Sequence, residues 1–314
     1  RRMLTTQFEV ADARRFVPLW DEPSAKATLA LQDVIPQGQS AYSNMPVASS
    51  AEANGKQVVR FATSPRMSSY LLHLTVGDLE RISRKAAGVE IGIVTRKGAA
   101  EQGRVALDAA VEILPWYNDY FGTSYPLPKL DMIAVPGTSQ FFGAMENWGA
   151  IMYFEQALLM DPQISSESDR LNIYDAVAHE MAHQWFGNLV TMEWWDDLWL
   201  NEALATWLDT KLTARLEPSW RYGEWSRRMT SWAMQTDALS TVRRIRQPAE
   251  SRSDIESSFD GSTTYSKGAA VLAMVEGWVG EAAFRAGLRR YLSAHAWGNA
   301  TAADLFAALA AESG

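Results

Sequence analysis

The sequence predicts an α+β fold in which a β-rich N-terminal part is followed by a mainly helical part. Its 314 residues are long enough for about two domains of ~150 residues each. β-prone runs separated by prolines fill the beginning of the chain, whereas apolar residues recur at helical spacing through most of the remaining sequence. A hydrophobic fraction of 47% with 21% charged residues is ordinary for a packed globular protein.

The N-terminal part is predicted to be extended. Val58–Phe61 and Tyr70–Val76 are rich in residues that favour strands. Prolines recur from Pro18 to Pro65, which favours short strands and turns over helices in this region. We therefore assign residues 1–83 to part of a β-rich N-terminal domain.

The character of the chain changes after a basic, glycine-punctuated stretch from Arg81 to Gly103. Beyond it, apolar residues repeat every three to four positions, which is the spacing of one face of a helix. We assign residues 84–314 to a second, mainly helical domain. The helices we predict are Val105–Tyr120, Leu171–Phe186, Leu198–Leu216 and Ala269–Trp278, and a small sheet is expected around Asp131–Val135 and Ala150–Phe154.

Composition and charge exclude several classes of protein. A net charge of −8 does not supply the clustered basic surface that nucleic acids need, so we expect no nucleic-acid partner. The longest apolar run, Ala269–Val279, is interrupted by Glu276, and we expect no transmembrane helix. The chain has no cysteines, so a bound metal ion would need His and carboxylate ligands.

The start of the chain does not indicate a cellular compartment. It begins at Arg1 rather than Met and has no signal-peptide pattern. We expect an internal piece of a longer, soluble protein, and whether a targeting segment precedes Arg1 stays open. The compartment, cytoplasmic or extracytoplasmic, and the oligomeric state therefore stay open.

A metal-binding pattern lies within the run AVAHEMAHQWFG. His179 and His183 are four positions apart, so on a helix both imidazoles project from one face at a separation that suits tetrahedral zinc. Because the chain has 4 histidines, the pattern H-E-x-x-H would arise by chance in under about 1% of such chains. Glu180, between them, is suited to act as the general base on a water molecule and later as the proton donor to the leaving amine. The pattern predicts one Zn²⁺ per chain.

A third protein ligand is expected, because a catalytic zinc ion keeps three protein ligands and one open position. Glu202, in the run LWLNEALA, is the natural candidate, since the intervening residues allow one helix to end near Gly187 and a second to return against it. A solvated helical glutamate is the alternative. Asn201 is a candidate for orienting one of the histidines, and a surface or capping role is equally open.

Further motifs resemble the M1 family of zinc aminopeptidases, the gluzincin group that includes aminopeptidase N and the puromycin-sensitive enzyme. Upstream of H-E-x-x-H, Gly143–Asn147 reproduces the G-A-M-E-N exopeptidase motif of that family. Downstream, Tyr265–Gly268 resembles its catalytic-tyrosine segment. The stretch from Thr6 to Pro23 is similar to a conserved part of the family's β-domain, and the order and spacing of the motifs agree along the whole chain.

The resemblance implies the architecture and the substrate. Residues 1–83 would be the C-terminal half of a saddle-like β-domain, and residues 84–314 a thermolysin-like zinc peptidase domain that is truncated at its C-terminal end. The implied activity is removal of the N-terminal residue from peptides, so the implied partners are peptide substrates with a free N-terminus.

Roles for individual residues are also implied by the resemblance. Glu146 and Glu9 would bind the free α-ammonium group, and Tyr265 would donate a hydrogen bond to the oxyanion of the reaction. Gln7 would line the pocket for the first side chain. The remaining substrate-binding residues would be Gly143, Ala144, Met145 and Asn147, the first two through their backbone.

Two alternative functions are compatible with the same fold. One is an epoxide hydrolase-like relative, although that branch typically has Gly where this chain has Ala144. The other is a binding protein without catalysis. Such a relative would be expected to lose a metal ligand or the base, whereas this chain retains all four residues, His179, Glu180, His183 and Glu202.

Overall fold

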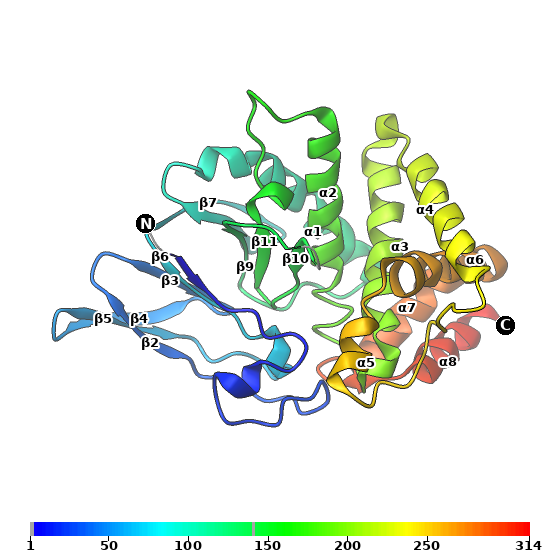
Figure 1. Cartoon of the computed structure of the whole chain (residues 1–314), viewed down its shortest axis with the longest axis horizontal. Helices are drawn as coiled ribbons and strands as arrows, with labels where there is room; N and C mark the ends of the chain where they lie inside the picture. The colour runs from blue at the N-terminus through cyan, green and yellow to red at the C-terminus, as the bar shows by residue number, and fades with distance from the viewer. Residues whose placement is uncertain (1–2, 140–141) are drawn as a thin grey trace. The chain divides into compact units, whose positions relative to one another are not determined.

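The computed structural model describes residues 3–139 and 142–314, which divide into two compact units (Figure 1). Two helices, α1 (Arg104–Phe121) and α2 (Glu167–Ala182), each contain a point at which the chain passes from one unit to the other. The first unit consists of Arg1–Asp21, Ala25–Pro115 and Tyr125–Met181, and the second of Glu22–Ser24, Trp116–Ser124 and Ala182–Gly314. The first two residues of the predicted N-terminal domain lie outside the described residues.

Two three-stranded antiparallel sheets form the N-terminal part of the first unit, with strand orders β1-β6-β3 and β2-β5-β4. They share one buried apolar cluster, since Ile35 and Val59 of one sheet belong to the same core as Leu74 and Val76 of the other. The strands are β1 (Met3–Thr5), β2 (Gln32–Pro36), β3 (Ser40–Ser43), β4 (Val47–Ala53), β5 (Lys56–Phe61) and β6 (Leu74–Gly77).

A five-stranded mixed sheet, in the order β10-β11-β9-β8-β7, completes the first unit. Its central strands β8, β9 and β11 run parallel, and both outer strands are antiparallel to their neighbours. Because β9 is buried along its whole length, its sequence is mostly apolar. Helix α1 provides the crossover between β8 and β9. The strands are β7 (Leu79–Ala86), β8 (Val89–Arg96), β9 (Lys129–Val135), β10 (Ala144–Met145) and β11 (Ala150–Phe154).

The sequence predictions for this unit are wrong in two places. The strand predicted over Tyr70–Val76 begins only at Leu74, because Ser69–Leu71 form a buried 3₁₀ turn. The stretch from Arg81 to Gly103, for which the sequence predicts no element, contains most of β7 and all of β8, so the sheet is larger than expected. The domain boundary after residue 83 falls inside β7 and stays a prediction.

Helices dominate the second unit, as the sequence predicts. All four predicted helices are confirmed, α1 and α2 mostly in the first unit and α3 and α6 in the second, although α2 ends at Ala182 rather than Phe186. A short parallel pair joins β12 (Thr191–Met192) to β13 (Asn299–Ala300). The helices of this unit are α3 (Trp199–Leu216), α4 (Tyr222–Asp237), α5 (Arg252–Ser257), α6 (Gly268–Val279), α7 (Glu281–His295) and α8 (Ala302–Ser313).

Short helical turns connect many of the longer elements. Such 3₁₀ helices occupy Ala13–Arg15, Ser69–Leu71, Ala100–Gly103, Glu155–Ala157, Trp195–Asp197 and Pro218–Trp220, and a π-helix occupies Gly261–Lys267. Within residues 3–139 and 142–314, none of the helices combines the length and the apolar character that a membrane span requires.

Candidate active site

Helix α2 positions the two histidines of the sequence motif. His179 and Glu180 lie in its last turn, and His183 follows directly after its end at Ala182. The four-residue spacing places both imidazoles on one side of the same helix end. Two imidazole nitrogens that could bind one metal ion are thus presented by the end of one helix.

His183 is oriented by its own chain. Its ring Nδ1 lies 3.1 Å from the carbonyl oxygen of Phe186. A carbonyl oxygen can only accept a hydrogen bond, so Nδ1 carries the proton and donates it there. The lone pair of Nε2 is therefore left for a metal ion, an arrangement that fixes both the tautomer and the orientation of the ring.

Glu202 is placed beside that nitrogen. The atoms His183 Nε2 and Glu202 Oε2 are 3.4 Å apart, both side chains are almost completely buried, and both residues belong to the second unit. Two ligand atoms of a zinc tetrahedron, each bonded at about 2.05 Å, are separated by about 3.3 to 3.4 Å. The pair therefore has the spacing of two ligands of one zinc ion, and it is longer than a typical charge-assisted hydrogen bond.

The chain between His183 and Glu202 turns sharply at Gly187. This residue has φ +117°, and a Cβ at its position would lie 2.7 Å from the side-chain amide of Asn201. Asn201 is buried in the first turn of α3, directly before Glu202. The close approach at Gly187 lets α3 return towards the end of α2, as the sequence predicts. The proposed contact of Asn201 with a histidine stays a prediction.

Tyr265 lies in the π-helix Gly261–Lys267 of the second unit, a rare element that occurs often at functional sites. The carboxylate of Asp260 caps this helix by accepting hydrogen bonds from its first turn. Gly268 follows it, and a Cβ there would lie 2.5 Å from the Cβ of Ala203, the residue after Glu202. The turn that carries Tyr265 therefore packs closely against α3, the helix that carries Glu202.

The G-A-M-E-N motif forms β10 and the turn after it, in the first unit. Ala144–Met145 pair with β11, and Phe154 N donates to Gly143 O at 3.0 Å. Because β10 is an outer strand of its sheet, its other edge has no neighbouring strand among the described residues. Glu146 is buried, and its carboxylate lies within 4.8 Å of that of Glu180. Two buried carboxylates thus lie close together, one of them directly after an outer strand of the sheet.

Gln7 and Glu9 lie in the irregular segment after β1. Gln7 Oε1 accepts hydrogen bonds from Phe8 N at 2.7 Å and from Glu9 N at 3.4 Å, so its side chain folds back on its own backbone. Glu9 is half-buried. The pocket-lining role of Gln7 and the amine-binding role of Glu9 stay predictions.

Sequence reasoning missed three buried polar residues, Asn44, His73 and Lys129, close to the turn after β10. Burial lowers the pKa of Lys129, although the nearby carboxylate of Asp131, 2.9 Å away, opposes the shift. Burial and the Lys129 ammonium lower the pKa of His73 to about 3, so its ring is neutral at pH 7. The sequence could have indicated a buried Lys129, because it stands two residues before an aspartate in an otherwise apolar strand. No local pattern indicated that Asn44 and His73 are buried.

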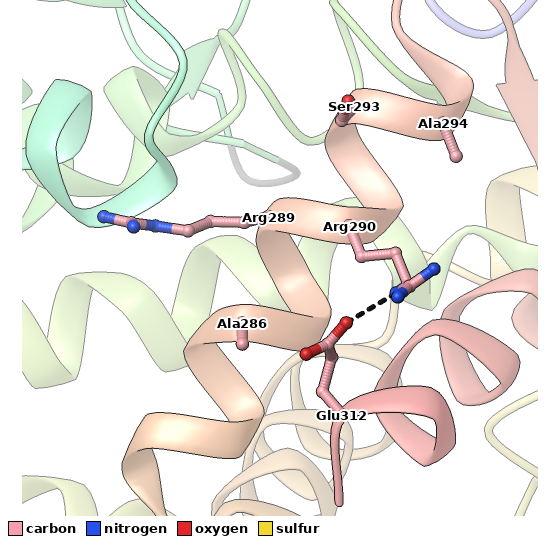
Figure 2. A pocket seen from close by; sticks show the side chains of 6 residues that line it. All are labelled: Ala286, Arg289, Arg290, Ser293, Ala294 and Glu312. Carbon is pink, nitrogen blue, oxygen red and sulfur yellow. Dashed lines mark hydrogen bonds and ion pairs between the residues drawn. The ribbon is translucent and has the colours of Figure 1, made fainter.

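An open depression lies on the surface of α7 and α8 in the second unit (Figure 2). It has a volume of about 530 Å³, and two of its lining residues form an ion pair, Arg290 Nε with Glu312 Oε1 at 2.6 Å. None of the predicted site residues lines it. The lining residues are Ala286, Arg289, Arg290, Ser293, Ala294 and Glu312.

Comparison with known families agrees with the geometry. A sequence profile described as "Peptidase M1 N-terminal domain" matches residues 1–71, and one described as "Peptidase family M1 domain" matches residues 105–314. The chain belongs to the M1 family. Both the resemblance noted from the motifs and the predicted α+β fold are thereby confirmed. The two matches leave the predicted M1 domain boundary after residue 83 undecided.

Several proteins that are similar to this M1 chain are named aminopeptidases. Aminopeptidase N of Acetobacter pasteurianus is 53% identical over 209 residues, which is 66% of this chain and 59% of that protein. Aminopeptidase M1-B of Oryza sativa subsp. japonica is 43% identical over 317 residues, covering 100% of this chain and 36% of that protein. Leucyl aminopeptidase of Saccharolobus solfataricus is 41% identical over 305 residues, covering 97% of this chain and 38% of that protein. The chain thus spans well under half the length of the last two relatives.

Proposed function

We propose that this M1 chain carries the active site of a zinc aminopeptidase that removes single residues from the free N-terminus of peptides. The observation that carries the proposal is the spacing of 3.4 Å between His183 Nε2 and Glu202 Oε2, with His179 one helical turn earlier. Three such protein ligands with one open position are typical of catalytic zinc, whereas structural zinc sites use four. The names of the relatives agree with this function.

The donor set suits Zn²⁺, because two neutral imidazoles and one carboxylate are among its commonest catalytic ligands. When bound, zinc would polarise the scissile carbonyl group and lower the pKa of the attacking water. The hydrogen bond from His183 Nδ1 to the Phe186 carbonyl keeps the lone pair of Nε2 available to bind the zinc ion. Asn201, beside the Gly187 turn, is the candidate for steadying this part of the ligand shell.

We assign the proton transfers to Glu180 and the stabilisation of negative charge on the substrate's carbonyl oxygen to Tyr265. Glu180 is adjacent to His179 in the last turn of α2, and its buried carboxylate would accept the proton of the attacking water. The same carboxyl group would then protonate the leaving amine. Tyr265 would donate a hydrogen bond to the substrate's carbonyl oxygen as that atom gains negative charge.

Restriction to the first peptide bond is assigned to Glu146 and Glu9. Their carboxylates would bind the α-ammonium group and so fix which peptide bond reaches Glu180. The outer edge of β10 would pair with the substrate main chain in the manner of an added strand, which is the role given to Gly143 and Ala144. In this proposal Gln7, Met145 and Asn147 shape the surroundings of the first residue.

The variant Glu146→Gln tests the amine-binding role. Glutamine keeps the size of the side chain but removes its charge, so we expect kcat/KM for aminoacyl amides to fall by about 10- to 100-fold, the usual range for a charge-assisted hydrogen bond. N-acetylated amides have no free amine, and we expect neither the wild type nor the variant to cleave them. Steady-state kinetics on both substrate types measures the difference.

Glu101→Gln is the matched control, since Glu101 is an exposed carboxylate of the same unit. Its kinetics should equal those of the wild type. If Glu146→Gln also leaves kcat/KM for the aminoacyl amides unchanged, Glu146 does not bind the ammonium group.

A further inference from the structure

The turn that carries Glu146 has a defined backbone geometry. β10 ends at Met145, and the chain turns directly back into β11. Asn147 N donates to Met145 O at 2.9 Å, and Ala150 N donates to Asn147 O at 3.0 Å. Because Glu146 lies inside this turn, groups that anchor the turn also determine where its carboxylate lies.

Asn44, immediately after β3, provides one anchor. Its Nδ2 donates to the carbonyl oxygens of Trp148 at 2.9 Å and Leu71 at 2.7 Å, and its Oδ1 accepts from His73 N at 2.9 Å. Asn44 is only 3% exposed, so water does not replace these bonds readily. One side chain thus joins the backbone of two other segments, and one of these is the turn after Glu146.

Lys129, at the start of β9, provides a second anchor. Its Nζ donates to Gly149 O at 2.7 Å and to Ser43 O at 2.5 Å, and it pairs with Asp131 Oδ2 at 2.9 Å. Gly149 has φ +76°, and a Cβ there would lie 2.5 Å from the carbonyl oxygen of Asn44. The end of β3 and the turn are therefore in close backbone contact, held by two buried donors.

We infer that Asn44 is a positioning residue for recognition of the substrate's free N-terminus, because its bond to Trp148 sets the place of the Glu146 carboxylate. The inference rests on the proposed function, in which Glu146 binds the ammonium group. Asn44 itself touches no substrate. Since a charge-assisted hydrogen bond is short and directional, a small displacement of the turn weakens it while the zinc ligands stay in place.

The test compares two zinc-binding inhibitors on the zinc-loaded protein by calorimetry. One is an aminoacyl hydroxamate, and the other is the same molecule with hydrogen in place of its amino group. We expect the wild type to bind the amino compound at least about tenfold more tightly. Asn44→Ala should lose most of this preference, with the affinity for the compound lacking the amine unchanged within about twofold.

Two further variants help to interpret the result for Asn44→Ala. Lys129→Met removes the donor to Gly149 and should lower the same preference, and it decides the question if Asn44→Ala does not fold. Ser64→Ala is the control, because Ser64 is a buried residue of the same unit that bridges Leu29 N and Pro65 O at 2.8 Å without touching the turn. Its preference should match the wild type.

The outcomes separate the inference from the function on which it rests. If the wild type does not distinguish the two hydroxamates, the assignment of Glu146 fails and the role of Asn44 fails with it. If the wild type distinguishes them and the Asn44 and Lys129 variants do so equally well, only the inference is overturned. If the variants bind both compounds more weakly by the same factor, the inference is also overturned, since that result reflects a general structural role.

Discussion

Glu180→Gln is expected to lower kcat by about 10²- to 10⁴-fold, which is the usual contribution of a general base, and to leave the zinc content at one ion per chain. Glutamine has the shape of glutamate but accepts no proton from water. The metal should stay, because Glu180 is not one of the three assigned ligands. Turnover of an aminoacyl fluorogenic amide and metal analysis of the purified protein check both parts.

Glu167→Gln, in the first turn of the same helix, is a matched control and should keep full activity. A normal kcat for Glu180→Gln would remove Glu180 as the base. Loss of zinc from that variant would instead make it a metal ligand.

His183→Ala is expected to reduce zinc affinity by more than about 100-fold, because even residues that only support a ligand contribute 10- to 100-fold. His183 follows His179 by four positions and lies 3.4 Å from Glu202, so its replacement removes one of the three proposed ligands. Zinc content after dialysis against a weak chelator measures the effect, and activity should fall in parallel.

His295→Ala, in the last turn of α7, is the control for removing a histidine outside the predicted site. It should retain its zinc. If His183→Ala binds zinc as tightly as His295→Ala does, the ligand assignment is wrong.

Local patterns made the candidate site predictable. His179 and His183 are brought together by the period of one helix, which the sequence displays directly. The prediction of Glu202 required one further step, which was that a second helix returns after a turn near Gly187. The motif residues Glu146 and Tyr265 were found through the resemblance alone, since an isolated glutamate or tyrosine has no periodic signal.

Contacts between distant segments could not be predicted in this way. The bond from Asn44 to Trp148 joins residues 104 positions apart, and no local pattern in the sequence indicates it. The missed strand β7 is half-exposed, and its basic residues gave the appearance of a boundary. In Tyr70–Val76 the apolar residues are buried whether the backbone is a 3₁₀ turn or a strand, so composition did not separate the two.

The central claim is a zinc-dependent cleavage that requires a free N-terminus. The most direct measurement is hydrolysis of aminoacyl fluorogenic amides beside their N-acetylated forms, with and without a zinc chelator. We expect cleavage of the free-amine substrates only, abolished by the chelator and restored by added zinc. Equal cleavage of the acetylated forms, or cleavage that the chelator does not affect, would contradict it.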